Sequence, residues 1–537
     1  MDGMTTSSRA ALQRILYTLS ILSTAVPLGA QPWRPDLGDG RYRNPIIFAD
    51  YSDPDVLRVG DDFYMTASSF GHVPGLPILH SRDLVNWTLV GHAIQHLPAD
   101  SAGPQHGNAV WAPSLRFHDG WFLVYYGDPD RGIYVVRARD VRGPWEAPRL
   151  VRAAKGWIDP APFWDDDGQA YLVHAFARSR AGIKHRLHVS RLSADGLTLL
   201  GSDSLVFMDS TRHPTMEGPK LYKRDGWYYV FAPAGGVPTG WQTVLRARTP
   251  FGPYEDRIVM AQGPTPVNGP HQGGWVHLAS GEDWFVHFQD RGAYGRIVHL
   301  QPMTWKDGWP VIGEDPDGDG TGQPVLVHRK PDVGRTYASA APATSDEFSA
   351  RTLGLQWQWQ ANPEPGWHSL DAHPGALRLF ARPLAGVSLW SAGNLLLQKL
   401  PAPTFTATTR LVPHGAGTFG LTVFGLDDAY LAVRRADAGW EVVHALGHDL
   451  DRGSAAETID ARAPVRAGPV WLRVQVDSVA RDSARCTFAY STDGARFTPL
   501  GAPSMAREGK WVGAKVGLFA VGADTAAYVD ADWFRVR

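Results

Sequence analysis

Residues 215–236 read TMEGPKLYKRDGWYYVFAPAGG, and this stretch decides how the first half of the chain folds. An acid, Glu217, stands directly before Gly218-Pro219, and a short apolar run, an Asp-Gly turn and an aromatic run follow. Two short runs of this kind around an Asp-Gly pair are typical of paired β-strands. A carboxylate at the start of the first strand is unusual, and the same arrangement recurs along the chain.

The pattern of this stretch occurs five times in the first half of the sequence. The segments are SDPDVLRVGDDFYMTAS, WAPSLRFHDGWFLVYYG, IDPAPFWDDDGQAYLVHA, MEGPKLYKRDGWYYVFAPA and PHQGGWVHLASGEDWFVHF. They align on Asp53, Ala112, Asp159, Glu217 and His271. A repeat of about 50 residues made of short strands and tight turns is typical of a β-propeller. The sequence therefore predicts a five-bladed β-propeller, in which each repeat forms one blade.

The aligned positions predict a shared site at the propeller axis. Equivalent residues of the innermost strands point to the axis, so Asp53, Asp159 and Glu217 are expected to converge there with His271. An isolated acid near a turn usually only caps or solvates it. The common register of these acids in three repeats favours a functional site instead.

Convergent carboxyl groups provide the chemistry of glycosidic bond cleavage. One carboxyl group donates a proton and another activates water. A third acid nearby raises the pKa of the proton donor by like-charge repulsion. The sequence contains no nucleophile elbow, phosphate-binding loop, dinucleotide glycine pattern or HExxH motif. The residues favour a glycosidase, and a non-catalytic glycan-binding propeller is the alternative.

From about Asn44 to about Val327 the sequence resembles glycoside hydrolase family 43, whose members are five-bladed propellers that cleave plant cell-wall glycans. The Asp-Pro pairs of SDPDVLRVGDDFYM and IDPAPFW, the WAPS segment and the EGPKLYK segment occur in the family's order. The resemblance implies that Asp53 is the general base, Asp159 the residue that tunes and orients the acid, and Glu217 the general acid. It also implies inversion of the anomeric configuration.

Further site residues follow from the same resemblance. Arg296, in GRIVHLQP, matches an arginine that contacts the terminal sugar, and Phe70, Trp111 and Ala112 match positions that wall this subsite. His271, in GPHQGG, matches a histidine at the axis that contacts the sugar region or reaches a central ion through water. On its loop position alone, Trp241 is expected to stack on the sugar beyond the cleaved bond.

This chemistry requires no cofactor, and no metal ligands are predicted for the site. A structural calcium ion near the propeller axis stays open as an alternative. EDPDGDGTG (314–322) looks like a calcium loop, but position 12 counted from Asp315 is Leu326, where an EF-hand has Glu. We interpret it as a tight turn that closes the propeller.

The second half of the chain has a different pattern. Residues 328–348 are polar and rich in Ala, Pro and Ser, and alternating strands such as VWLRVQVD (470–477) follow them. The predicted domains are a propeller at 31–335, a linker at 336–345 and a β-sandwich at 346–537. EFSARTLGLQWQWQANPEPGWHSL resembles the lectin-like (concanavalin A-like) domain of family xylosidases. That resemblance implies a loop that closes the pocket and favours exo-action.

The composition and the N-terminus complete the prediction. Lys and Arg number 52 and Asp and Glu 54, so a nucleic-acid partner is not expected. Arg9 and Arg14 precede the apolar residues 15–30, which are typical of a signal peptide (1–30) cleaved after Ala30. The chain is thus expected to be exported without a membrane anchor; its oligomeric state stays open.

Taken with the resemblance, these features predict an exo-acting, inverting hydrolase. It is expected to release terminal β-D-xylose, α-L-arabinofuranose or both from xylo- or arabino-oligosaccharides. An endo-acting arabinanase or xylanase of the same family is the alternative.

Overall fold

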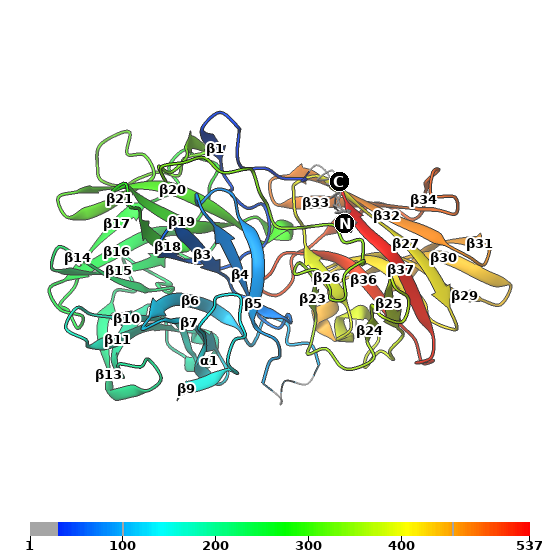
Figure 1. Ribbon diagram of the computed structural model, residues 1–537, viewed down its shortest axis with the longest axis horizontal. Helices are drawn as coiled ribbons and strands as arrows, with labels where there is room; N and C mark the ends of the chain where they lie inside the picture. The colour runs from blue at the N-terminus through cyan, green and yellow to red at the C-terminus, as the bar shows by residue number, and fades with distance from the viewer. Residues whose placement is uncertain (1–30, 99–100, 102, 454–455) are drawn as a thin grey trace, which may run out of the picture.

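The computed structural model describes residues 31–537 except 99–100, 102 and 454–455. Its described residues form almost only β-strands, in two bodies that lie side by side (Figure 1). The first body is a five-bladed β-propeller and the second a β-sandwich, as the sequence predicted. The predicted signal peptide lies outside the described residues. No helix in the described part of the chain is long and apolar enough to span a membrane.

Each propeller blade is a four-stranded antiparallel sheet whose strands follow sequence order. Blade I consists of β2 (Asp55–Val59), β3 (Asp62–Thr66), β4 (Gly75–Ser81) and β5 (Thr88–Ile94). Blade II consists of β6 (Trp111–His118), β7 (Trp121–Asp128), β8 (Gly132–Ala138) and β9 (Arg149–Ala153). Blade III consists of β10 (Trp157–Trp164), β11 (Ala170–Phe176), β12 (Arg186–Leu192) and β13 (Leu199–Met208), with α1 (Arg178–Ala181) between β11 and β12.

The last two blades repeat the same plan. Blade IV consists of β14 (Lys220–Arg224), β15 (Trp227–Ala234), β16 (Trp241–Ala247) and β17 (Glu255–Met260). Blade V consists of β18 (His271–His277), β19 (Asp283–Asp290), β20 (Arg296–Lys306) and β21 (Trp309–Ile312), with the 3-10 helix η1 (Gly292–Tyr294) before β20. The first strands β2, β6, β10 and β14 lie next to one another in that order around the axis. β18 contacts β15 and β16 of blade IV on one side and β2 of blade I on the other, which completes the ring.

The Asp-Gly turns seen in the sequence join the first two strands of blades II and IV. Asp119 and Gly120 have φ angles of 49° and 73°, and Asp225 and Gly226 have φ angles of 50° and 73°. Two successive residues with positive φ match the right-handed twist of the strands that they join. These turns set the register of the hairpins that approach the axis.

Apolar clusters between neighbouring blades hold the propeller together. One cluster joins blades I and V and includes Met65 and Trp284, and comparable clusters fill each of the other four junctions. The segments that precede and follow the five blades also pair with each other, because β1 (Arg41–Arg43) pairs with β22 (Val327–Arg329). The backbone of Ile47 pairs with that of Val298 in blade V.

Two antiparallel sheets form the sandwich. The seven-stranded sheet runs in the order β23 (Gln358–Trp359), β26 (Leu396–Lys399), β36 (Lys515–Val521), β28 (Thr418–Phe424), β29 (Asp428–Ala436), β30 (Gly439–Gly447) and β31 (Thr458–Val465). The eight-stranded sheet runs in the order β24 (His368–Ser369), β25 (Leu377–Phe380), β37 (Tyr528–Val536), β27 (Phe405–His414), β32 (Val470–Ala480), β33 (Ser483–Ser491) and β34 (Thr498–Pro499). β35 (Ser504–Ala506) pairs with β33, and η2 (Leu389–Ser391) and η3 (Leu450–Arg452) are short 3-10 turns.

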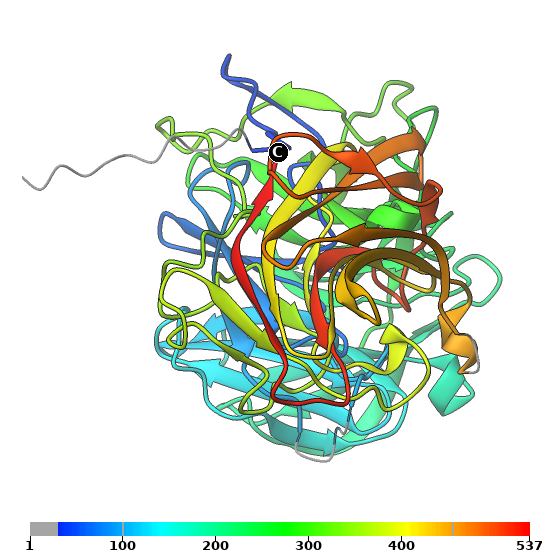
Figure 2. The ribbon, with the colours of Figure 1, turned by 90° about the vertical axis from the view of Figure 1, so that its right-hand side faces the viewer.

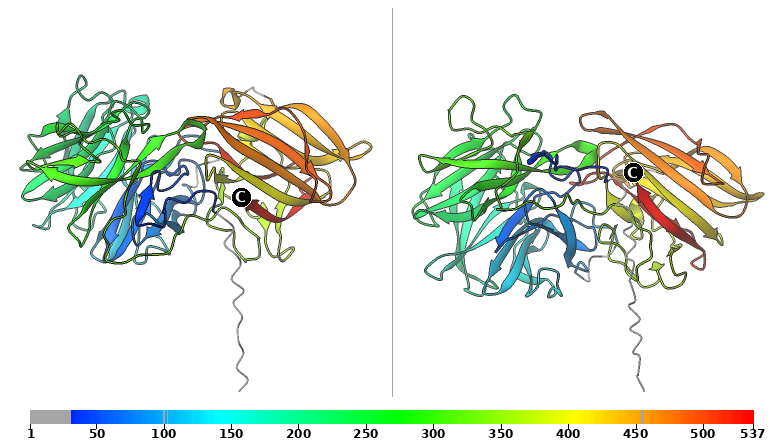
Figure 3. Two further views of the ribbon diagram at one scale, coloured as in Figure 1. Left: turned by 90° about the horizontal axis from the view of Figure 1, so that it is seen from above. Right: turned by 45° about the horizontal axis from the view of Figure 1, so that its top comes forward.

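The sandwich lies in front of the propeller when seen from the sandwich side (Figure 2), and beside it when seen from above (Figure 3). Residues 330–345, which include the predicted linker, form neither helix nor strand. Backbone hydrogen bonds in both directions join Val73 of the propeller to Trp359 of the sandwich, with N···O distances of 3.0 and 2.6 Å. At this contact the main chains of the two domains therefore hydrogen-bond directly to each other.

The acidic loop 314–322 folds as a tight turn. The carboxylate of Asp315 accepts hydrogen bonds from the backbone N–H groups of Gly318 and Gly320, at 2.9 and 3.0 Å. Oxygens of Asp315, Asp317 and Asp319 lie within 4.8 Å of one another. Their carboxylates cap the backbone of the loop itself.

Candidate active site

The structure brings together the three acids that the repeats aligned. Asp53, Asp159 and Glu217 line one cavity of about 660 Å³. Asp53 lies just before β2, Asp159 lies in β10 and Glu217 lies just before β14. The cavity therefore opens where the first strands of three blades begin.

Irregular backbone at these positions aims the side chains at the cavity. Asp53 and Asp159 both have a φ angle of 55°, in the left-handed region that residues with a Cβ rarely adopt. The pairing of β10 with β11 shifts between Ile158 and Ala161, so Asp159-Pro160 forms a bulge. Bulges re-aim side chains and are frequent beside active sites. A regular strand would alternate these side chains into the sheet faces.

Asp53 is surrounded by hydrogen-bond donors. The hydroxyl groups of Ser52 and Ser68 donate to its Oδ2 atom at 2.8 and 2.5 Å. Arg296 Nη1 lies 3.3 Å from its Oδ1 atom. An ionised carboxylate only accepts hydrogen bonds, so this set of donors suits the form that a general base must have.

Asp159 and Glu217 have the opposite surroundings. Burial, reinforced by the negative charge of Glu217, raises the pKa of Asp159, although the Gly218 N–H donates to its Oδ2 atom at 2.8 Å. Burial also raises the pKa of Glu217, and the charge of Lys184, whose Nζ atom lies 3.4 Å from Oε2, opposes this rise. The pair therefore retains a proton at a pH where an ordinary carboxyl group has lost it.

His271 lies behind Glu217 rather than in the cavity wall. Its side chain is fully buried, and its Nε2 atom lies 3.5 Å from Glu217 Oε1. Burial, with the nearby charges of Arg296 and Lys184, lowers the pKa of His271 to about 3, so the ring is neutral at neutral pH. The prediction that it lies at the axis fits this position, whereas direct contact with a sugar does not.

Aromatic side chains wall the cavity on the propeller side, as predicted. Phe70 and Trp111 contact each other edge to face, with ring centroids 6.4 Å apart, and Ala112 lies beside them. The Trp111 Nε1–H group donates to the Gly107 carbonyl at 2.9 Å, which fixes the ring. Arg296 lines the same cavity from the start of β20.

Trp241 is the predicted residue that the structure places elsewhere. It begins β16, and its side chain packs against the apolar cluster between blades III and IV. Its ring lies so close to Gly235 that a Cβ there would approach it to 2.6 Å. Trp241 does not line the cavity, because strand pairing with Ala234 turns it toward the blade. That Trp241 stacks on the sugar stays a prediction, which this placement does not support.

Trp511 lies at the rim of the cavity, where Trp241 was expected. It comes from the sandwich, in the loop between β35 and β36, and lines the cavity with 54% of its surface exposed. Its ring contacts Trp111 edge to face at 6.1 Å, and the Arg296 guanidinium lies 5.8 Å from its centroid. The buried carboxylate of Asp50 fixes this loop, because it accepts hydrogen bonds from the backbone N–H groups of Arg296 and Gly513 at 2.9 and 3.0 Å.

The cavity is also lined by Trp511, Lys184 and Gln272, which the sequence did not predict. Lys184 reaches the cavity from the segment between α1 and β12, and Gln272 follows His271 in β18. The sequence did contain a signal for Gln272, because this residue directly follows His271, one of the positions on which the repeats align. Lys184 and Trp511 lie outside the repeats, and only the folded chain shows that they reach the same cavity.

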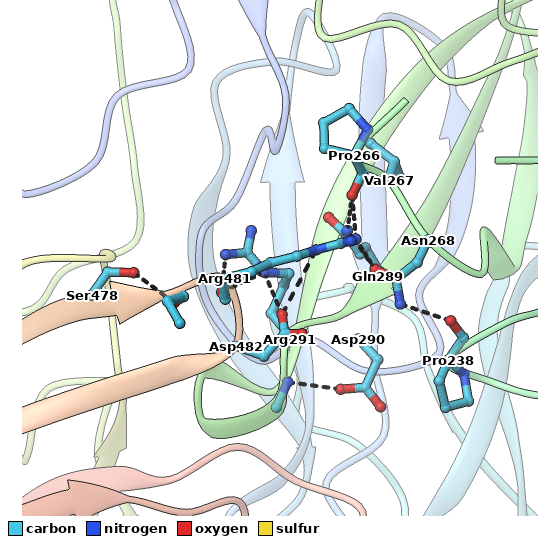
Figure 4. A network of polar contacts seen from close by, with 12 residues as sticks. Pro238, Pro266, Val267, Asn268, Gln289, Asp290, Arg291, Ser478, Arg481 and Asp482 are labelled. Carbon is cyan, nitrogen blue, oxygen red and sulfur yellow. Dashed lines mark hydrogen bonds and ion pairs between the residues drawn. The ribbon is translucent and has the colours of Figure 1, made fainter. Parts of the chain in front are cut away.

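A second contact between the domains supports the same side of the cavity (Figure 4). The hairpin between β32 and β33 brings the Arg481 guanidinium against the Pro266 carbonyl and the Asn268 side chain. Asn268 Nδ2 in turn donates to the carbonyl of Pro238, a residue of the cavity wall, at 2.8 Å. The sandwich thus steadies the wall through a chain of hydrogen bonds.

Fold and site together define the class of propeller glycoside hydrolases, and comparison with known proteins identifies the family. The model of glycosyl hydrolases family 43 matches residues 42–310. The model of the beta xylosidase C-terminal concanavalin A-like domain matches residues 345–537. The chain belongs to glycosyl hydrolase family 43 and is a glycosidase.

Individual relatives match between 64% and 92% of this chain. A putative beta-xylosidase of Xylanibacter ruminicola is 41% identical over 487 residues, which cover 90% of this chain and 86% of that protein. A non-reducing end alpha-L-arabinofuranosidase of Bacteroides ovatus is 33% identical over 386 residues, or 64% of this chain and 65% of that one. The crystal structure of a xylan beta-1,4-xylosidase from Bacillus halodurans superposes with a TM-score of 0.81 at 26% identity, covering 92% of this chain and 99% of that chain.

Gly218→Ala should impair activity because of two constraints. Gly218 has a φ angle of 62°, and an added Cβ would lie 2.2 Å from the Gln272 side chain in the cavity wall. The neighbouring Glu217 would shift, and we expect a loss of at least about tenfold in kcat/KM, since small misplacements of catalytic groups are costly. Gly60→Ala is the control, because its φ angle of 63° is similar but no atom lies within 4 Å of the added Cβ. Equal activity of the two variants would contradict this reasoning.

Lys184→Met should shift the pH profile of kcat/KM. The Lys184 ammonium group favours ionised Glu217 and lowers its pKa, so its removal should raise that pKa. Glu217 would then keep its proton to higher pH, and the alkaline limb should move upward. Lys184→Arg keeps the charge and should leave the limb in place. A downward shift in Lys184→Met would show that the proton donor is a different group.

Proposed function

We propose that this protein is an exo-acting, inverting glycosidase that releases terminal β-D-xylose or α-L-arabinofuranose from xylo- or arabino-oligosaccharides. The observation that carries the proposal is a single cavity that combines three carboxylates of the propeller with an aromatic rim residue of the sandwich. The names of the relatives from Xylanibacter ruminicola and Bacteroides ovatus support the two substrate types.

In the proposed reaction, Asp53 and Glu217 act from opposite sides of the bond. Asp53, which accepts hydrogen bonds from Ser52 and Ser68 and faces Arg296, removes a proton from water as the water attacks the anomeric carbon. Glu217, whose pKa burial raises, donates its proton to the departing oxygen. A single displacement of this kind inverts the anomeric centre.

Asp159 has a positioning role in this proposal. Its Oδ2 atom accepts the Gly218 N–H group, which directly follows Glu217 in the chain. Asp159 therefore fixes the backbone that carries the acid, and repulsion between the two carboxylates favours the state in which one of them holds a proton. The reaction needs no cofactor, because side chains of the chain supply both proton transfers.

The rim formed by Trp511 supports exo-action. A second cavity of about 640 Å³ adjoins the first and shares Val237, Pro238, Arg296 and Trp511 with it. We place the terminal sugar beside the carboxylates and the remainder of the oligosaccharide in this second cavity, between the two domains. A polymer chain that extended in both directions would meet the aromatic wall of Phe70 and Trp111.

Substitution of the two proposed catalytic residues should give different substrate dependences. Glu217→Gln should lower turnover of alkyl glycosides and oligosaccharides by about 10²–10⁴-fold and that of activated aryl glycosides far less, because a good leaving group needs little protonation. Asp53→Asn should abolish both activities, and azide should restore turnover by replacing the activated water. Asp225→Asn, at an exposed turn, is the control and should change neither. Equal losses on every substrate in both variants would contradict the roles.

The product pattern tests exo-action directly. A linear xylo- or arabino-oligosaccharide should yield monosaccharide from the earliest time points, because only its terminal residue fits beside the carboxylates. The same oligosaccharide with a substituent on its terminal non-reducing sugar is the control and should resist hydrolysis. Chromatography that shows early di- and trisaccharides with little monomer would identify an endo-acting enzyme.

A further inference from the structure

A cluster of two histidines and an aspartate lies in blade III, outside the cavity described above. His174 lies in β11, His188 in β12 and Asp203 in β13, which are three adjacent strands of the blade. His174 and His188 are direct partners in the register of β11 and β12. The three side chains therefore meet on one face of the sheet.

The cluster brings three potential metal ligands together, with Asp203 at hydrogen-bond distance from both imidazoles. His174 Nε2 lies 3.1 Å from Asp203 Oδ1, and His188 Nδ1 lies 2.5 Å from Asp203 Oδ2. One ligand atom from each residue lies within 4.8 Å of the other two. Two imidazole nitrogens and a carboxylate oxygen are a donor set that Zn²⁺ and similar transition metals prefer, whereas Ca²⁺ prefers oxygen alone.

The hydrogen bond on the far side of His174 indicates which nitrogen is free to bind. His174 Nδ1 lies 3.2 Å from the carbonyl oxygen of Ala175, and a carbonyl only accepts, so Nδ1 carries the proton. In the neutral ring, Nε2 then directs a lone pair at a carboxylate oxygen, and two acceptors cannot form a hydrogen bond. A cation between them removes the conflict, and metal-binding histidines commonly donate their other N–H group to a backbone carbonyl.

The surroundings hold the cluster in place and leave one side open. The Trp157 ring stacks on His174 with centroids 3.8 Å apart, and the Ser190 hydroxyl donates to Asp203 Oδ1 at 3.0 Å. His174 is fully buried, but 15% of the His188 side chain and 18% of the Asp203 side chain are exposed. Water can therefore reach a fourth coordination position.

We propose that blade III binds one divalent transition-metal ion through His174 Nε2, His188 Nδ1 and the Asp203 carboxylate. Zn²⁺ is a suitable ion with which to probe this site. The ion would join three of the four strands of the blade whose first strand carries Asp159. Its role would be structural, because none of its ligands lines the substrate cavity.

Calorimetric titration of the tag-free, chelator-treated chain with ZnCl₂ tests this proposal. We expect one saturable site per chain and a rise in the apparent Tm on saturation. His188→Gln and Asp203→Asn should each weaken binding at least about tenfold. Asp256→Asn is the matched control and should bind as the wild type does, because Asp256 faces a single imidazole, His213, at 2.7 Å. Circular dichroism and turnover of an aryl glycoside should show that each variant folds.

X-ray absorption of the Zn²⁺-loaded wild-type chain keeps the proposal testable if a variant fails to fold. The spectrum should show nitrogen and oxygen ligands that include two imidazoles. The absence of saturable binding would overturn the proposal, and an additional proton on the His174–Asp203 pair would then account for the cluster. Binding that survives both substitutions, or a first shell without imidazole, would overturn it as well.

Discussion

The burial of three carboxylates at one end of the propeller axis is the constraint on which the rest of the site depends. Charges removed from water are costly unless they are paired or neutralised. Two cations contact these carboxylates directly, Arg296 at Asp53 and Lys184 at Glu217. His271 is neutral behind them. A proton on Asp159 or Glu217 removes the remaining negative charge, and this is the proton that the proposed mechanism donates to the departing oxygen.

Residues of the sandwich and of the propeller together form the wall of the cavity. Asp50 joins the backbone of Arg296 to that of Gly513, so Arg296, which faces Asp53, and the loop that carries Trp511 are fixed by one buried carboxylate. Arg481 supports the cavity wall at Pro238 through Asn268 (Figure 4). The sandwich thus contributes Trp511 to a cavity whose three acids all come from the propeller.

The sequence predicted the propeller, the sandwich and the three acids because each depends on local signals that repeat. Asp-Gly turns, short alternating strands and a residue at a fixed place in each blade are visible without knowledge of distant contacts. Trp511 and Lys184 were not predictable in this way, because their positions depend on how a sandwich loop and the α1–β12 segment pack in space. Trp241 shows the same limit, since its loop position suggested the rim but pairing of β16 with β15 turned it into the blade.

The anomeric configuration of the first-formed product tests the central claim most directly, that Asp53 activates water while the Asp159–Glu217 pair supplies the proton. Proton NMR during rapid hydrolysis of an aryl β-D-xyloside, or of the corresponding α-L-arabinofuranoside if that is the substrate, distinguishes the two anomers before they equilibrate. A single displacement predicts that α-xylose, or β-arabinofuranose, is formed first. First formation of β-xylose, or α-arabinofuranose, would show a covalent intermediate and contradict the roles assigned to the three carboxylates.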